Sequence, residues 1–238
     1  MKIEVWSDYV CPFCYIGKRR LEQALETFQH RDKVEVTFKA FELQPNLQSD
    51  PTISLDEMLA KKMNVSVEQA KAMNKQMIAN AATVGLVYNF DEMKQTNTRD
   101  AHRLVKFAKT EGKEAALTER LLSAHFTESK YLGDSEVLLD LAEEVGLDRN
   151  QSKEVLSSEA FLEEVLQDQQ ESQQLGVQGV PFFVLNRKYA ISGAQPLDTF
   201  VKSIEKVWEE ENQLSPLEQL QPSAESGICT DDGCEVKK

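Results

Sequence analysis

Two cysteines three positions apart, Cys11 and Cys14, constrain the fold of this chain more than any other feature. They follow a short, largely apolar run at residues 3–6 and precede a segment in which Leu21 and Leu25 recur at helical spacing. The first thiol therefore lies where a strand gives way to a helix. Unpaired backbone N–H groups and the positive end of the helix dipole favour a thiolate there. Because Cys14 follows about one turn later on the same face, the pair is interpreted as a redox dithiol.

Half of a structural zinc site is the alternative for two close cysteines. Such a site needs about four ligands. The other candidates are two distant cysteines near the C-terminus and the three histidines, and none has finger-like spacing: His30, His102, His125. We therefore expect no metal and no cofactor, and inert thiols stay open as a second alternative.

The net charge of the chain excludes two classes of partner. Its 40 acidic and 27 basic residues give a net charge of −13, which repels nucleic acids and anionic membrane surfaces. No stretch approaches the roughly 18 apolar residues that span a bilayer, and no apolar signal segment precedes the first strand. We expect a cytoplasmic protein that binds neither nucleic acid nor membrane. Its four cysteines are too few for a disulfide framework.

An α/β pattern at the start of the chain gives way to a helical block. Residues 33–40 alternate apolar with polar side chains, which predicts a second strand parallel to the first. Turn residues then place a boundary near residue 45. Periodic apolar positions and capping residues predict helices at 66–85, where Ser66 and Gln69 form a capping box, from Thr98 to about 112, and at 114–127, 134–146 and 158–175.

The α/β pattern returns at residues 179–185. A turn leads into a second strand at 189–192, and an amphipathic helix follows from Leu197. The predicted order is β-α-β, a helical insertion, then β-β-α. We expect four parts: an N-terminal half at 1–45, the insertion at 46–175, a C-terminal half at 176–212 and a flexible tail at 213–238 that carries a C-x4-C pair.

Three motifs in this order resemble the DsbA-like branch of the thioredoxin-fold oxidoreductases, and more specifically its cytoplasmic FrnE-like subgroup. They are SDYVCPFCYIG at residues 7–17, NTRDAHR at 97–103 and GAQP at 193–196. The resemblance covers roughly residues 1–212. It implies an α/β thioredoxin fold with a large all-helical insertion and the activity of a protein disulfide oxidoreductase.

The resemblance also implies roles for single residues. Cys11 matches the nucleophilic cysteine and Cys14 the resolving one. Val180 and Pro181 match a loop whose proline is cis and faces the dithiol, where the backbone of Val180 can pair with an extended substrate; an ordinary loop proline is the alternative. Phe13 stands where relatives often have tryptophan and is expected to shield the disulfide.

Four further residues are weaker candidates. His102 and Arg103 belong to a segment that lies toward the active-site cleft in relatives, although the segment taken alone is better explained by a helix cap and a solvated face. Some relatives also carry a C-terminal cysteine pair, which here is Cys229 and Cys234. We weigh an auxiliary redox role for this pair, in exchange with Cys11, against incidental surface thiols and against metal binding with the acidic residues around it.

The predicted function is disulfide exchange through a mixed disulfide at Cys11. In a reducing cytoplasm, reduction or isomerisation is easier than net oxidation. The expected partners are thiol and disulfide substrates, either proteins or small molecules such as glutathione, and the oligomeric state stays open, a homodimer included. Two alternatives remain: a glutathione-dependent isomerase of the 2-hydroxychromene-2-carboxylate type, which usually has serine at the position of Cys11, and a non-enzymatic DsbA-like adaptor.

Overall fold

A four-stranded sheet in the order β2-β1-β5-β6 forms the centre of the computed structural model, which describes residues 1–212, 227–230 and 233–236. Strand β1 (Lys2–Ser7) pairs in parallel with β2 (Glu35–Ala40). Strand β5 (Phe182–Leu185) runs antiparallel to β1, and β6 (Tyr189–Ser192) antiparallel to β5. The predicted thioredoxin fold is thereby confirmed.

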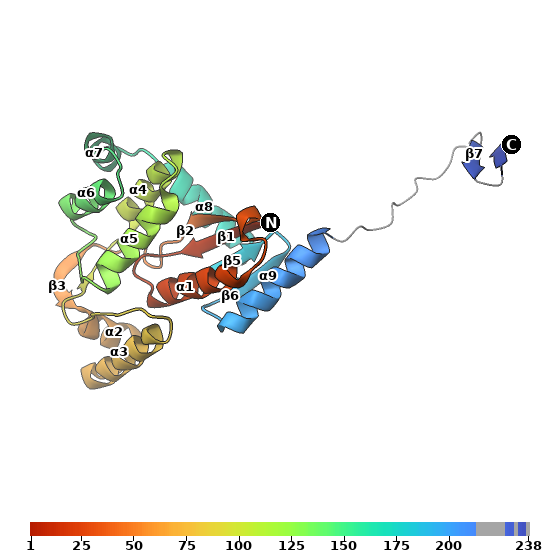
Figure 1. Ribbon diagram of the computed structural model, residues 1–238. Helices are drawn as coiled ribbons and strands as arrows, with labels where there is room; N and C mark the ends of the chain where they lie inside the picture. Colours follow the sequence, from red (N-terminus) through yellow and green to blue (C-terminus); the bar gives the residue numbers. More distant parts are fainter. Residues whose placement is uncertain (213–226, 231–232, 237–238) are drawn as a thin grey trace.

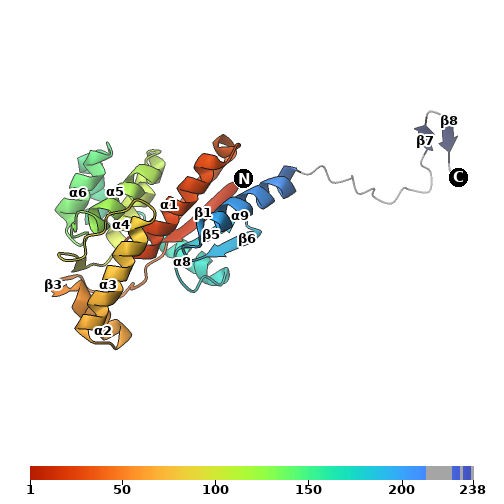
Figure 2. The same cartoon turned by 60° about the horizontal axis from the view of Figure 1, so that its bottom comes forward.

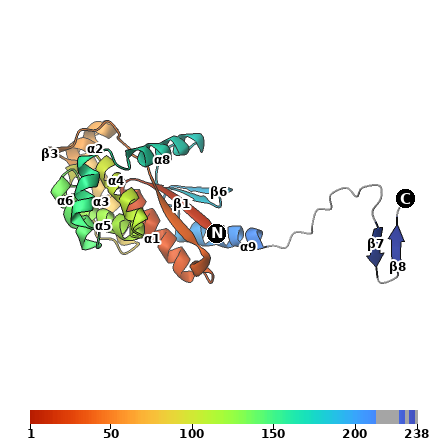
Figure 3. The same cartoon turned by 90° about the horizontal axis from the view of Figure 1, so that it is seen from above.

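Helices cover both faces of this sheet (Figures 1 and 3). On one face lie α1 (Pro12–Thr27), which joins β1 to β2 after the dithiol, and α9 (Leu197–Asn212). On the other face lies α8 (Leu162–Gln174). The sheet, α1 and α9 share one apolar core, which includes Ile3, Val5, Leu21, Ala24, Phe183, Phe200 and Ile204.

The helical insertion lies beside the sheet (Figure 1). Its helices are α2 (Leu55–Met63), α3 (Val67–Ala82), α4 (Arg99–Thr110), α5 (Glu114–Phe126), α6 (Ser135–Glu144) and α7 (Arg149–Ser157). The capping box of Ser66 and Gln69 is present at the start of α3. No helix of the described residues has the length and apolar character to cross a membrane.

The insertion differs from the sequence-based expectation in four ways, the first of which is α2, since the sequence patterns predict no helix at residues 55–63. It contains α7 and a small sheet of β3 (Asp50–Ser54) with β4 (Lys94–Gln95), because elements this short and polar carry little periodicity. Helix α4 does follow Thr98, but that hydroxyl does not cap it. Instead Oδ1 of Asn97 accepts from the backbone N of Arg99 at 2.9 Å.

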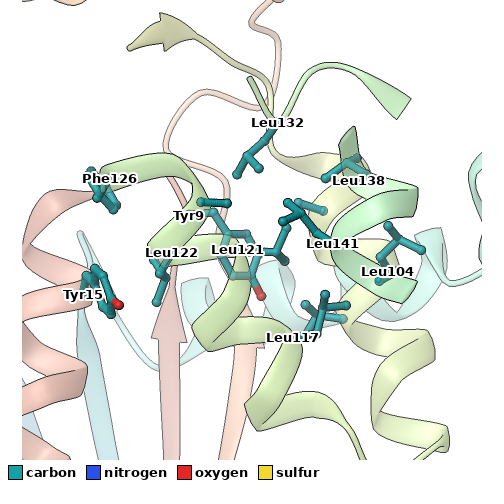
Figure 4. Close-up of a cluster of buried hydrophobic side chains, with 14 of the residues drawn as sticks. Tyr9, Tyr15, Leu104, Leu117, Leu121, Leu122, Phe126, Leu132, Leu138 and Leu141 are labelled. Carbon is teal, nitrogen blue, oxygen red and sulfur yellow. The ribbon is translucent and has the colours of Figure 1, made fainter. Parts of the chain in front are cut away.

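A second apolar core fills the insertion and reaches the dithiol helix. Figure 4 shows leucines of α4, α5 and α6 packed together with Phe126, Tyr9 and Tyr15. Tyr15 and Ile16 of α1 belong to this core, whereas Leu21 and Ala24 of the same helix belong to the sheet core. Helix α1 is therefore held from both sides, and its N-terminus lies at the junction of sheet and insertion.

Two short strands occupy the described part of the C-terminal tail (Figure 2). Strand β7 (Gly227–Thr230) pairs antiparallel with β8 (Gly233–Val236), with Cys229 opposite Cys234. The sequence predicts no regular structure in this tail. The expected flexibility of the tail concerns residues 213–226, 231–232 and 237–238, which lie outside the described residues.

Candidate active site

Cys11 is the N-cap of α1, and Pro12 occupies the first helical position, where its missing N–H leaves no donor unpaired. The backbone N of Cys14 donates to O of Cys11 at 2.9 Å and begins the helix. Both cysteines are free thiols and both are buried, with Cys11 6% exposed and Cys14 2%. Phe13 between them is 42% exposed. The dithiol thus has one thiol at the edge of solvent and one behind it.

A proline loop faces the first thiol. The Val180–Pro181 peptide bond is cis, as the resemblance implies, and Sγ of Cys11 lies 3.5 Å from O of Val180. The backbone N of Gly193 donates to O of Pro181 at 2.8 Å, which ties the loop to the end of β6. A Cβ at Gly17 would lie 3.0 Å from the Pro181 side chain, so only glycine lets α1 approach the loop this closely.

The second thiol is held in its protonated form. Burial raises the pKa of Cys14 well above its usual value, and the adjacent Cys11 sulfur adds to the rise. Hydrogen bonds from Ser7 and from the backbone N of Asp8, the latter at 3.4 Å from Sγ, oppose this effect. The surroundings of Cys14 therefore favour its protonated thiol.

His102 is 3% exposed and lies against the dithiol loop, the segment of residues 8–11 between β1 and α1. Its Nε2 is 3.5 Å from Oδ1 of Asp8, and its ring contacts that of Tyr9 at 4.7 Å. The other oxygen of Asp8 accepts from the backbone N of Leu43 at 2.8 Å. Asp8 thus joins the dithiol loop to α4 and to the loop after β2, a positioning role that sequence reasoning missed although the residue stands just before the cysteines.

Arg103 lies away from the dithiol. Its Nε donates to O of Ala160 at 2.9 Å, and Nη2 donates to the carbonyls of Val155 and Ser158. These contacts hold the end of α7 against α4. Arg103 is therefore not part of the proposed site. The side chains of the tail cysteines lie outside the described residues.

A cavity of about 180 Å³ adjoins Cys11 on the side of the insertion. Tyr88 stands close by and donates to O of Pro12 at 2.7 Å, which fixes the first turn of α1. His125 lines the cavity from α5. Neither residue carried a signal in the sequence, because only the fold brings residues some 80 to 110 positions apart into contact with the dithiol. Among the described side chains, no group of three or more metal-ligating residues is placed to hold a metal ion.

A sheet of this topology with a dithiol at a helix N-terminus, facing a cis-proline, defines a thioredoxin-fold dithiol protein. The chain belongs to the family of the DSBA-like thioredoxin domain, whose model matches residues 2–205.

Known proteins resemble the chain over most of its length. The uncharacterized protein YwbO of Bacillus subtilis (strain 168) is 31% identical over 206 residues, which cover 85% of this chain and 94% of that protein. The crystal structure of the probable DsbA oxidoreductase SCO1869 from Streptomyces coelicolor is 39% identical, covers 99% of both chains and has a TM-score of 0.85. The cytosolic disulfide reductase DsbM from Pseudomonas aeruginosa, with GSH, shares the fold at 18% identity and a TM-score of 0.60, covering 88% of this chain and all of that one.

Proposed function

We propose that this chain is a thiol–disulfide oxidoreductase in which Cys11 is the nucleophile and Cys14 the resolving cysteine. The 3.5 Å contact between Sγ of Cys11 and O of Val180 carries the proposal, because it sets a thiol at a helix N-terminus against a backbone edge beside Pro181. An extended polypeptide can pair with such an edge and bring its own sulfur to Cys11. Phe13, between the two cysteines in the sequence, is exposed.

Reduction of a substrate proceeds in two exchanges. The Cys11 thiolate attacks a substrate disulfide: a bond forms between the two sulfurs, the substrate disulfide breaks, and one substrate sulfur leaves as a thiolate. Cys14 then loses its proton and attacks Sγ of Cys11, which releases the second substrate sulfur. The substrate gains two electrons, and the Cys11–Cys14 dithiol becomes a disulfide. Oxidation of a dithiol substrate is the same sequence in reverse.

We further propose that the protein reduces or isomerises disulfides in the cytoplasm, as a member of the FrnE-like subgroup, with glutathione among its thiol partners. The structural likeness to DsbM, described as a cytosolic disulfide reductase with GSH, supports this direction. The three sequence motifs at residues 7–17, 97–103 and 193–196 support the subgroup. In a glutathione-buffered compartment, reductive exchange is also the easier direction.

The tail cysteines are proposed as an auxiliary redox pair. Cys229 and Cys234 are directly opposed across the β7–β8 hairpin. Opposed residues of an antiparallel pair have Cα atoms about 4.5–5.5 Å apart, which matches the usual range for a disulfide. Such a pair can accept the disulfide from Cys11 and Cys14 by the same exchange chemistry.

Two matched serine variants test the proposed function with insulin as the substrate. Cys11→Ser removes the nucleophile and should abolish disulfide reduction. Cys14→Ser leaves the first exchange intact and should accumulate a mixed disulfide between Cys11 and insulin, detectable by mass spectrometry after acid quenching. Reduction at the wild-type rate by Cys11→Ser would refute the proposal, and the absence of any exchange in the wild type would favour the adaptor alternative.

A further inference from the structure

The cavity beside Cys11 is sized for one side chain. Its volume is about 180 Å³, whereas pockets for whole small molecules usually measure about 300–1,000 Å³. Apolar side chains from the loop after β2, from α2 and from the segment before α4 form most of its wall: Leu43, Leu47, Leu55, Met58, Leu59, Phe90, Met93. An apolar group that entered it would lie directly beside the reacting sulfur.

One buried polar group interrupts these apolar walls. His125 lines the cavity, is 2% exposed, and its Nδ1 has no hydrogen-bond partner among the described residues. Burial lowers the pKa of His125 to about 4, so the imidazole is neutral at pH 7. A buried ring nitrogen without a hydrogen-bond partner is costly. A ligand hydroxyl, which can both donate and accept, would remove that cost.

The charged groups around the cavity are all basic. Lys62 and Lys94 line it, and no aspartate or glutamate does. Within the part of the chain that the structure describes, neither lysine forms an ion pair with a carboxylate. Two lysines at the cavity wall favour an anionic group next to whatever occupies the cavity.

We propose that this cavity is a specificity subsite for a tyrosine side chain, an aromatic ring that carries a hydroxyl, next to the reacting cysteine of an acidic polypeptide. The proposal rests on the proposed function, since it takes Cys11 as the reacting group. Phenylalanine or leucine would cover the apolar walls but leave Nδ1 of His125 unpaired. Serine would offer a donor but leave the walls uncovered, and glutathione has no apolar group for the cavity.

Peptide disulfides that differ at one residue test the subsite. The substrates are Gly-Cys-X-Glu-Gly peptides, with X as Tyr, Phe or Ser, each joined through its cysteine to 2-mercaptoethanol. Reduced protein is mixed with each peptide, and the second-order rate is measured by acid quenching and mass spectrometry. The tyrosine peptide should react about tenfold faster than the phenylalanine peptide, as one net hydrogen bond allows, and the serine peptide more slowly than both.

His125→Leu removes the unpaired nitrogen and puts an apolar side chain in its place. It should bring the rate of the tyrosine peptide down to that of the phenylalanine peptide. His30→Leu is the matched control, because His30 stacks on Trp208 and does not line the cavity. Should His125→Leu fail to fold, Leu59→Trp fills the cavity from α2 and should slow the tyrosine and phenylalanine peptides more than the serine peptide.

The outcomes separate this subsite from the proposed function. The small disulfide of 2-mercaptoethanol reports only on the dithiol. Normal exchange with it, together with equal rates for the three peptides or a faster reaction with glutathione disulfide, would overturn the subsite and leave the proposed function standing. If the protein exchanges with none of these disulfides, both the subsite and the proposed function are overturned.

Discussion

At the scale of single residues, the two sulfurs of the dithiol differ in their surroundings. Cys11 caps α1 at the edge of solvent, and Cys14 lies one turn behind it, 2% exposed. Burial raises the pKa of Cys14, with the Cys11 sulfur as the second cause. The burial of Cys14 persists when Cys11 is bound in a mixed disulfide. In the proposed mechanism, deprotonation of Cys14 therefore limits the second exchange.

The release of the second product should consequently accelerate with pH. In a reaction with 5,5′-dithiobis(2-nitrobenzoate), Cys11 displaces one coloured thiolate and Cys14 then displaces the other. Since only a thiolate attacks, the second rate should rise about tenfold per pH unit between pH 6 and 8, below the pKa of Cys14. Stopped-flow absorbance follows both releases in the Cys229→Ser/Cys234→Ser variant, whose thiols are Cys11 and Cys14, and adding Cys14→Ser should leave only the first release. A second release that is independent of pH would contradict this account.

The sequence predicts the dithiol because two cysteines and a helix pattern are local signals. It does not predict the contacts of Asp8, Tyr88 and His125, which depend on how the insertion packs against the dithiol loop. Arg103 shows the reverse case. Its motif is recognisable in the sequence, but the fold turns its guanidinium toward backbone carbonyls at the end of α7.

At the scale of elements, helix α1 is positioned by two cores. Its first turns pack into the insertion and its later turns against the sheet. Gly17 lies between these regions and faces the proline loop: an added Cβ would meet the Pro181 and Phe183 side chains at 3.0 Å. The distance between Cys11 and the loop thus depends on the absence of a side chain at position 17.

Gly17→Ala should displace the proline loop from the dithiol. The overpacking costs about 1–3 kcal/mol, and the better helix propensity of alanine offsets about 0.5–1 kcal/mol of it. We expect a loss of roughly 1 kcal/mol in the free energy of unfolding by urea and a several-fold slower insulin reduction. Gly179→Ala, whose added Cβ meets no atom within 4 Å, is the control. Unchanged stability and rate in Gly17→Ala would contradict the argument.

Prediction of elements from the sequence succeeds where periodicity is long. Helices α3 to α6 and α9 and the strands of the central sheet carry clear patterns. Helix α7 buries only Ser152 and Val155, and α2 buries only Ala60. Strand β3 is polar apart from Pro51 and Ile53, and β4 has only two residues. These elements form because the surrounding fold supports them, so the local sequence does not predict them.

At the scale of the whole molecule, the chain carries two cysteine pairs. The 14 residues 213–226 separate α9 from the hairpin of Cys229 and Cys234. They reach at most about 50 Å. Helix α9 is about 24 Å long and begins just after Gly193, which is bonded to Pro181. This length of chain allows the second pair to reach Cys11, as its proposed auxiliary role requires.

Exchange between the two pairs should therefore be intramolecular. When Cys11 and Cys14 are oxidised by a stoichiometric amount of diamide, the disulfide should move to Cys229 and Cys234 at a rate that does not change with protein concentration. Alkylation and peptide mapping over time measure this transfer. The Cys229→Ser/Cys234→Ser variant should reduce insulin more slowly, while Ser223→Ala/Ser226→Ala in the same tail should not. A transfer rate proportional to protein concentration would argue against the tethered pair.

The most direct test of dithiol exchange at Cys11 and Cys14 is an equilibrium titration against glutathione redox buffers in the Cys229→Ser/Cys234→Ser variant, with acid quenching, alkylation and mass spectrometry. We predict one two-electron transition, in which Cys11 and Cys14 pass together from two alkylated thiols to one disulfide. A titration in which the two thiols respond independently, or in which Cys11 binds glutathione and no Cys11–Cys14 disulfide forms, would contradict this account.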